Sequence, residues 1–403
     1  MRLALLGCDE AWQAFLRDLP AKHQLVAVYE AAEHELPLNA LLPGVERHEQ
    51  WEALLVRDDI DVVLIASARL LKIQRDGLDP QMRRVDQLKK LAQAGISLLV
   101  SHPGAELLDA YEIEMLRREG GGCVLPWFPG LNHPAWQELS GVRIDRVEAA
   151  AQISWERRAI GRTRDDVLTA LACDLILMER IAGKPKRVTA LGGPAASESR
   201  HPNWQSLTVQ IETADQTVIR WSLAGLSATF TYRVSLSEGE TAWELEAPMD
   251  LALPWLLRMK AADHDAGEIE WNETTATLNE VERIRSSPAD ANEAWLEACR
   301  SLETLAAVEK SLQRGRTIEL SQAEQTEEHA FKGVMASAGC LLLMLTLCAL
   351  FVVALVEGLQ LPLRNSMIWR LWPLALVIPL AGFLGLQFLQ TVIKKPENER
   401  LRV

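Results

Sequence analysis

Two long apolar segments near the C-terminal end limit what this chain can fold into more than any other feature. Residues Val334–Val356 contain no charged side chain, and residues Trp369–Ile393 contain only Arg370, at their start. A helix needs about 20 apolar residues to cross the hydrocarbon layer of a membrane, and runs of this length are rare in soluble cores. We therefore expect a transmembrane helical hairpin over residues 334–393, with helices at 334–356 and 369–393.

Basic residues around these segments indicate how the hairpin lies in the membrane. The short connection between the helices carries Arg364 and Arg370. The outer flanks carry more positive charge, at Lys332, Lys394, Lys395, Arg400 and Arg402. Positive flanks stay in the cytoplasm, so we expect both termini and the soluble domains there, at the cytoplasmic (inner) membrane. Asp9 and Glu10 also interrupt the N-terminal segment too early for a secretory signal.

The composition bears on the protein's partners and on disulfide and metal sites. The formal net charge is −13 and the isoelectric point is about 5.2. An acidic body repels phosphate backbones, which argues against nucleic acid as a general partner. The six cysteines form no C-x-x-C pair and no cluster. Neither a disulfide framework nor a metal site is therefore expected.

Apolar strands alternate with helices in the first third of the chain. The expected strands are residues 2–7, 25–30, 61–67 and 96–100. Helical spacing is found at residues 82–94 and 105–119, and glycines follow both segments. Continuous apolar strands between helices are typical of a parallel sheet covered on both faces. We predict an α/β Rossmann-like domain of the dinucleotide-binding type over residues 1–128.

Beyond this domain, apolar residues recur at every second position. The alternating positions include Leu207, Val209, Ile211, Ile219, Trp221, Leu223, Phe230, Tyr232, Val234 and Leu236. This period indicates an antiparallel sheet with one buried face. Helices are expected at residues 165–181 and 292–314. We predict an α+β antiparallel-sheet domain over residues 129–325.

Several segments occur in a recognisable order. LALLG, a helix and LVAVYE come first, and RDDIDVVLIAS and ISLLVSHP follow. LPWFPGLNHPAWQEL, DLILMERIAGKPKRVTAL and LEACRSLETLAAVEKSLQRGRTIEL complete the series. In this order, residues 1–320 resemble the Gfo/Idh/MocA oxidoreductases, the group of glucose–fructose oxidoreductase and inositol dehydrogenase. The resemblance implies an NAD(P)-dependent oxidoreductase acting on a sugar or cyclitol, whose second domain, residues 129–325, binds substrate or forms oligomers. The hairpin is foreign to the usual family pattern.

The phosphate-binding motif is incomplete. A dinucleotide site has G-x-G-x-x-G after the first strand, and here the three glycine positions are Gly7, Asp9 and Trp12. Asp9 brings a carboxylate to the helix N-terminus, where the phosphates would bind. A carboxylate at that place is also a good helix cap and would occupy the anion site itself. The motif therefore predicts weak or lost NAD binding.

The resemblance assigns further residues to the cofactor. Cys8 belongs to the phosphate loop, and Glu30 ends the second strand, where an acid holds the ribose hydroxyls of NAD and repels the 2′-phosphate of NADP. Ser67 lies at the turn that is usually Ala-Thr-Pro. Ser101 and Pro103 are the outer residues of the segment that is usually Glu-Lys-Pro.

The expected catalytic positions are altered as well. His102 replaces the family's lysine, and it is either a proton shuttle or an ordinary loop histidine. The family's His-x-x-Asp pair falls on Cys173 and Ile176. Asp174 is an acid beside them, but one residue along a helix turns a side chain by about 100°. Asp174 is catalytic only if this alignment is shifted by one residue, and Cys173 is a core residue or a nucleophile.

Two functions remain open from the sequence. The first is a membrane-anchored, NAD-dependent dehydrogenase that retains a small sugar-like ligand. The second is a non-catalytic binding or scaffold subunit, a pseudoenzyme at the membrane. In the family the open sheet face commonly pairs with a second copy, and Trp221, Tyr232 and Trp243 are large side chains available for such pairing. We therefore expect a homo-oligomer.

Overall fold

The computed structural model describes residues 1–31, 44–68, 79–144, 151–159, 161–194, 203–238, 241–259, 265–269 and 271–320, and beyond these only single positions at 344, 351, 354, 355 and 358. Residues Met1–Ser321 form one compact unit and Gln322–Val403 form another. Within the described residues, no helix has the length and apolar character needed to cross a membrane. The hairpin expected over residues 334–393 lies outside the described residues, except for those single positions.

The N-terminal sheet is parallel, as the apolar strands predict. Its strands are β1 (Arg2–Leu6), β2 (Gln24–Tyr29), β3 (Glu46–His48), β4 (Val62–Ile65), β5 (Leu98–Ser101) and β6 (Val124–Trp127). They lie in the order β3-β2-β1-β4-β5-β6 in the described part of the chain. The accompanying helices are α1 (Glu10–Arg17), the 3-10 helix η2 (Trp51–Val56), α3 (Pro80–Gln93) and α4 (Leu107–Gly120). The prediction of a Rossmann-like sheet is confirmed.

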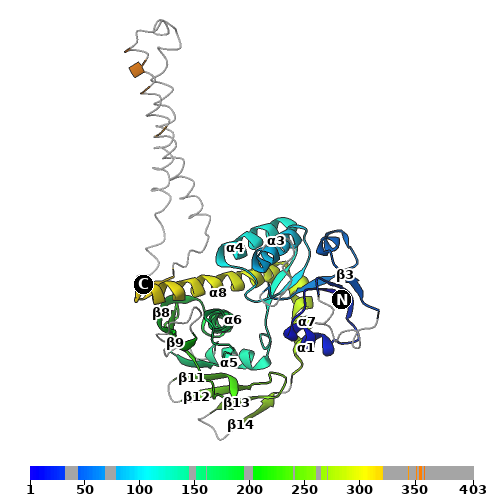
Figure 1. Ribbon diagram of the computed structural model, residues 1–403. Coiled ribbons are helices and arrows are strands. Elements are labelled where there is room, and N and C mark those ends of the chain that lie inside the picture. Colours follow the sequence, from blue (N-terminus) through cyan, green and yellow to red (C-terminus); the bar gives the residue numbers. More distant parts are fainter. Residues whose placement is uncertain are drawn as a thin grey trace, which may run out of the picture. The chain divides into compact units, whose positions relative to one another are not determined.

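Helices cover both faces of this sheet, which is why its strands are apolar throughout. Leu3 and Leu5 pack toward α1 and α7 (Glu273–Arg285). Ala4 and Leu6 point the other way, toward α3, α4 and α8 (Pro288–Arg314). The opposite directions follow from the two-residue period of a strand. Helix α8 has 27 residues and contacts both β6 and strand β8 (Pro185–Pro194) of the second sheet (Figure 1).

The second sheet is mixed rather than antiparallel. Its strands are β7 (Gln152–Arg157), β8 (Pro185–Pro194), β9 (Trp204–Thr213), β10 (Val218–Leu223), β11 (Phe230–Glu238), β12 (Thr241–Pro248), β13 (Trp255–Met259), β14 (Asp265–Ile269) and β15 (Ile318–Glu319). Their order is β14-β13-β12-β11-β7-β10-β9-β8-β15. Strands β7 and β10 pair in parallel, and the other neighbouring pairs are antiparallel. The prediction of a wholly antiparallel sheet is therefore wrong. A helix and two strands separate β7 from β10, so the chain returns in the same direction.

One face of this sheet packs on α5 (Pro134–Ile144) and α6 (Arg164–Ala182) (Figure 1). Trp221 and Tyr232 are fully buried in that core. Trp243 is partly buried and packs against the same core. The expectation that these three side chains lie on the open face is therefore wrong. A period of two assigns them to one common face but does not say which face the helices cover.

Candidate functional site

The candidate site lies at the carboxyl ends of β1 and β4, where the strand order reverses. Strands β2 and β3 lie on one side of β1, and β4, β5 and β6 lie on the other. Open α/β sheets bind their ligands in the crevice at this point. Gly7 begins the loop after β1 with φ +74° and donates its N–H to the carbonyl of Tyr29 at 2.8 Å. Cys8 follows and is buried.

Asp9 closes this crevice with its own carboxylate. Its Oδ1 accepts the N–H of Trp12 at 2.9 Å and caps helix α1, which confirms the cap predicted from the sequence. Its Oδ2 accepts the N–H of Ser67 at 3.4 Å, from the loop after β4. Burial raises the pKa of Asp9, against these hydrogen bonds and the charge of Arg84. One side chain therefore joins the two loops that border the crevice.

Trp12 fills the place where the third glycine would leave space. Its side chain is fully buried and stacks on Trp127, with ring centroids 3.9 Å apart. Its Nε1 donates to Ser101 Oγ at 2.9 Å, at the end of β5. Phe15 contacts both indoles edge-on. These aromatic contacts link α1 to the ends of β5 and β6.

Glu30 is held by helix α3. Its carboxylate pairs with Arg83 and accepts Gln87 Nε2 at 3.0 Å. Arg84, on the same helix, is 1% exposed and donates one N–H to Gln87 Oε1 at 2.8 Å. Burial lowers the pKa of Arg84 to about 10, although Glu30 and Asp9 oppose this shift.

Arg84 is not among the site residues expected from the sequence, although its position in the helix carries a signal. Arg84 stands four residues before Leu88 and seven before Leu91, on the apolar face of the helix. A charged residue at such a position has to be paired or compensated. The spacing therefore marks Arg84 as a buried cation, but it does not reveal that Glu30 and Asp9 act on its charge.

These residues do not fit a dinucleotide. The carboxylate of Asp9 takes the helix N–H and the loop N–H that would bind phosphate oxygens. The carboxylate of Glu30 is engaged by Arg83 and Gln87 rather than directed at ribose hydroxyls. Trp12 removes the close approach that a glycine permits. The crevice is filled by the chain itself.

His102 is buried and neutral. Its Nε2 lies 2.9 Å from Ser301 Oγ on α8. Burial lowers the pKa of His102 to about 3, with only the backbone of Ala172 acting against this shift. Pro103 follows His102, and their peptide bond is cis. The imidazole therefore makes a structural contact between β5 and α8 and is uncharged at neutral pH.

Asp174 faces the second sheet, away from His102. It is fully buried, accepts Trp221 Nε1 at 2.7 Å, and lies 3.8 Å from the Nε of Arg157. Burial raises the pKa of Asp174 to about 6. Its neighbour Cys173 approaches His102, with the Cys173 Sγ 3.4 Å from the histidine carbonyl oxygen. The structure therefore does not bring the side chains of His102 and Asp174 together. Asp174 follows Cys173 on the helix, so its side chain points about 100° away from the one that contacts His102.

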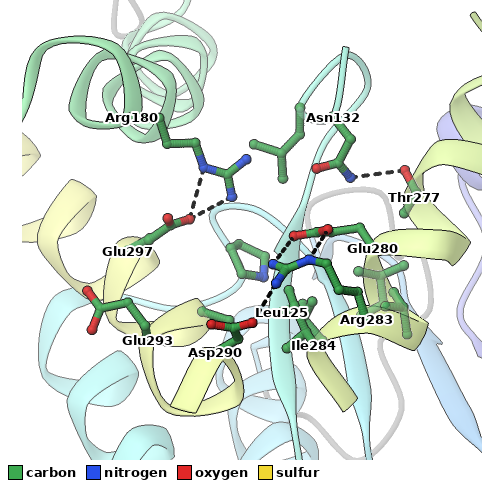
Figure 2. Close-up of a pocket in the computed structure, with 15 residues that line it drawn as sticks. Leu125, Asn132, Arg180, Thr277, Glu280, Arg283, Ile284, Asp290, Glu293 and Glu297 are labelled. Atoms are coloured by element: carbon green, nitrogen blue, oxygen red, sulfur yellow. Dashed lines mark hydrogen bonds and ion pairs between the residues drawn. The ribbon is translucent and has the colours of Figure 1, made fainter. Parts of the chain in front are cut away.

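Two cavities lie near the site, and neither is lined by His102 or Asp174. A cleft of about 630 Å³ adjoins Pro103 and is lined in part by Leu168, Leu302 and Leu305. A smaller cavity of about 160 Å³ is shown in Figure 2. No group of side chains in the described residues is suited to holding a metal ion.

The charged side chains around the smaller cavity are paired, most of them with one another. Arg180 pairs with Glu297 at 2.6 Å, and Arg283 pairs with Glu280 at 2.7 Å and with Asp290 (Figure 2). Ion pairs of this kind leave little free charge to attract a ligand. The crevice at Asp9 therefore remains the better candidate.

Solved structures of several oxidoreductases have a similar architecture. No protein-family model and no curated protein sequence matches the chain. Aldose-aldose oxidoreductase from Caulobacter crescentus has a TM-score of 0.64 at 14% identity, covering 79% of this chain and 99% of that one. A myo-inositol dehydrogenase from Corynebacterium glutamicum has 0.62 at 16% identity, covering 80% and 99%. A 3-ketoreductase from Actinomadura kijaniata has 0.61 at 15% identity, covering 77% and 98%. The chain therefore has the fold of the Gfo/Idh/MocA-type oxidoreductases.

Proposed function

We propose that this protein is a non-catalytic binding or scaffold subunit with an oxidoreductase fold, held at a membrane by its C-terminal hairpin. The observation that carries this proposal is the position of Asp9. Its carboxylate caps α1 and bridges to Ser67, so the protein supplies the anion that its crevice would otherwise take from a ligand.

The negative charge of Asp9 disfavours the binding of a nucleotide at this place. Two unit charges about 4 Å apart near a protein surface interact by about 4 kcal/mol. A free energy of about 1.4 kcal/mol corresponds to a tenfold change in affinity. Even partly screened, the charge of Asp9 weakens the binding of a pyrophosphate by one or more orders of magnitude. A ligand has to displace this carboxylate before its phosphates can bind.

The catalytic groups support the same proposal. A general base has to lie within reach of the proton that it removes, with a pKa near the working pH. Burial lowers the pKa of His102 to about 3, and its Nε2 is engaged with Ser301. Asp174 is enclosed between α6 and the second sheet. Neither side chain is presented to a substrate.

The second candidate is an NAD(P)-dependent oxidation or reduction of a sugar or cyclitol. It is favoured by the fold shared with a myo-inositol dehydrogenase and an aldose-aldose oxidoreductase, and by Gly7, which keeps the tight turn after β1. Under this candidate Glu30 favours NAD, because a carboxylate repels the 2′-phosphate of NADP.

A titration with NADH separates the two candidates. We expect the full-length protein to show no saturable binding at micromolar NADH, because Asp9, Trp12 and Glu30 are all committed to contacts within the chain. We also expect no turnover with myo-inositol or aldoses. Fluorescence titration and an absorbance assay measure these quantities. The NAD binding oxidoreductase from Klebsiella pneumoniae is the positive control for binding, and the myo-inositol dehydrogenase from Corynebacterium glutamicum is the positive control for turnover. Micromolar affinity in the natural protein would restore the enzyme candidate.

The membrane hairpin is a separate part of the proposal. It is supported by the two apolar segments and their basic flanks. We expect the full-length chain to stay with membranes through carbonate extraction, whereas a chain ending at Ser321 should appear in the soluble fraction. A tag after Val403 should be reached by protease only from the cytoplasmic side. Release of the full-length chain by carbonate would exclude the hairpin, and cleavage of the tag from outside would reverse its orientation.

A further inference from the structure

A basic surface surrounds the edge strand β15, although the chain as a whole has a formal net charge of −13. It includes the C-terminal end of α8 and the turn into β8, and we call it the basic face. All of its basic side chains belong to exposed residues: Lys184, Lys186, Arg187, Lys310, Arg314 and Arg316. Positive charge is therefore gathered here against the overall balance of the chain.

Hydrogen bonds bring these residues together from two distant parts of the sequence. Leu320 donates its N–H to the carbonyl of Lys186 at 2.8 Å, beside the pairing of β15 with β8. The Ser311 hydroxyl, on α8, donates to the carbonyl of Arg316 at 2.8 Å and accepts the N–H of Ala190, on β8, at 3.0 Å. Helix α8 thus ends beside β8 (Figure 1). The basic residues of these elements therefore lie at one place on the surface.

The cations of the basic face are only partly neutralised. Acids at the same surface are Glu212, Asp215, Glu309 and Glu319. Arg187 pairs with Glu319 at 3.3 Å and with Glu212 at 3.5 Å, whereas Glu309 pairs with Arg164. The other five basic side chains of the face form no ion pair among the described residues. The face therefore keeps a net positive charge.

The chain continues from this face toward the expected hairpin. Strand β15 ends at Glu319, and only residues 322–333 separate Ser321 from Val334, where the hairpin is expected to begin. A chain of this length spans at most about 45 Å even when fully extended. A membrane that holds the hairpin therefore lies within reach of the basic face.

We propose that the basic face docks on the anionic lipid headgroups of the membrane that holds the hairpin. This inference rests on the proposed function, because it needs the hairpin. A cytoplasmic leaflet carries anionic lipids, and each Lys or Arg near its surface favours the bound state by a factor of roughly five. The tether makes this contact intramolecular, so a weak attraction is enough to keep the face on the lipid. Docking turns the β15 edge of the second sheet toward the membrane and the β14 edge away from it.

The segment between the body and the hairpin is the competing occupant. It contains Glu324, Glu327 and Glu328, which carry the charge that the basic face attracts. Three carboxylates neutralise at most three cations, whereas a leaflet presents anionic groups over its whole area. We therefore assign the face to lipid, and the experiment below separates the two occupants.

Lysine acetylation of the full-length protein in nanodiscs tests the proposal. Neutral discs contain phosphatidylcholine alone, and anionic discs contain about 30% phosphatidylglycerol in addition. Mass spectrometry measures the acetylation rates of Lys184, Lys186 and Lys310. We expect these rates to be at least about fivefold lower in anionic discs at low salt and to recover in about 0.5 M NaCl, which screens the attraction. Lys90 on α3 is the reference, because it is exposed and should react equally in both discs.

A pair of charge reversals shows whether the place of the charge matters. Arg314→Glu with Arg316→Glu should abolish the protection of the three lysines in anionic discs. Arg17→Glu with Arg258→Glu is the matched control, because it changes the net charge equally at exposed positions elsewhere. Arg17 also lies in the last turn of its helix, as Arg314 does. The control should keep the protection, and thermal unfolding checks that both variants fold.

Two results would overturn the proposal while the hairpin stands. One is equal acetylation of the three lysines in neutral and anionic discs. The other is protection in both kinds of disc that disappears when Glu324, Glu327 and Glu328 are replaced by glutamine, which would make the segment itself the occupant. Retention of the chain in neutral discs reports on the hairpin separately. A chain that neutral discs do not retain would refute the hairpin, and the docking proposal with it.

Discussion

Replacement of Asp174 by alanine is expected to lower the free energy of unfolding by about 3 kcal/mol, because it leaves the partly buried guanidinium of Arg157 without its counter-ion. Asp174 is fully buried, and its Oδ1 lies 3.8 Å from the Nε of Arg157. The guanidinium of Arg157 also lies over the ring of Tyr232, 4.0 Å from its centroid. The substitution additionally removes the acceptor of the Trp221 indole, at 2.7 Å. Urea unfolding at pH 8, followed by tryptophan fluorescence, measures the loss.

Two further variants make this prediction specific to the buried pair. Arg157→Met with Asp174→Leu removes both charges and should cost less than Asp174→Ala alone, because apolar groups of similar size replace a buried ion pair at little cost. Glu319→Ala breaks the exposed pair with Arg187 and should cost no more than about 1 kcal/mol. A loss of that small size for Asp174→Ala as well would contradict the burial of the pair.

The second large effect is the dependence of stability on pH through His102. Burial lowers the pKa of His102 to about 3, whereas an unfolded histidine has a pKa of about 6.5. Below pH 6.5 the unfolded chain therefore binds a proton that the folded protein excludes, and stability falls as the pH drops. The slope approaches about 1.4 kcal/mol per pH unit well below pH 6.5, so His102 removes about 2 kcal/mol between pH 6.5 and pH 4.5.

His102→Gln should remove this share of the acid destabilisation, since glutamine keeps a polar group near Ser301 and does not titrate. Burial also lowers the pKa of His133 to about 3. The double variant with His133→Gln should therefore lose still less stability at acid pH. Ser301→Ala is the matched control, because it removes the hydrogen bond at 2.9 Å and leaves the histidine. Its loss should be nearly the same at pH 7 and pH 4.5. An unchanged pH profile in His102→Gln would mean that the imidazole titrates normally.

Much of the architecture follows from local patterns. The expected helix at residues 82–94 is α3 (Pro80–Gln93), and the one at 165–181 is α6 (Arg164–Ala182). The expected helix at 292–314 begins four residues earlier, at Pro288. Asp9 was expected to cap α1, and it does. These features depend on residues close together in the chain, where periodicity, caps and glycines act directly.

The candidate site was predictable only in part. The altered glycine positions showed that a phosphate cradle is incomplete, because the motif is local. The bond from Asp9 to Ser67 and the stack of Trp12 on Trp127 join segments far apart in the chain. The contact of His102 with Ser301 spans 199 residues. Such pairs are set by how the layers pack, and no spacing rule specifies them.

By itself the sequence determined the parallel sheet, the main helices, the capped N-terminus of α1 and the loss of the glycine motif. Only the tertiary structure decided which face of the second sheet is covered, that β7 and β10 pair in parallel, and that Arg84 and Asp174 are buried. The reason is physical: a period states which side chains share a face, whereas burial, pKa shifts and ion pairs depend on what packs against that face.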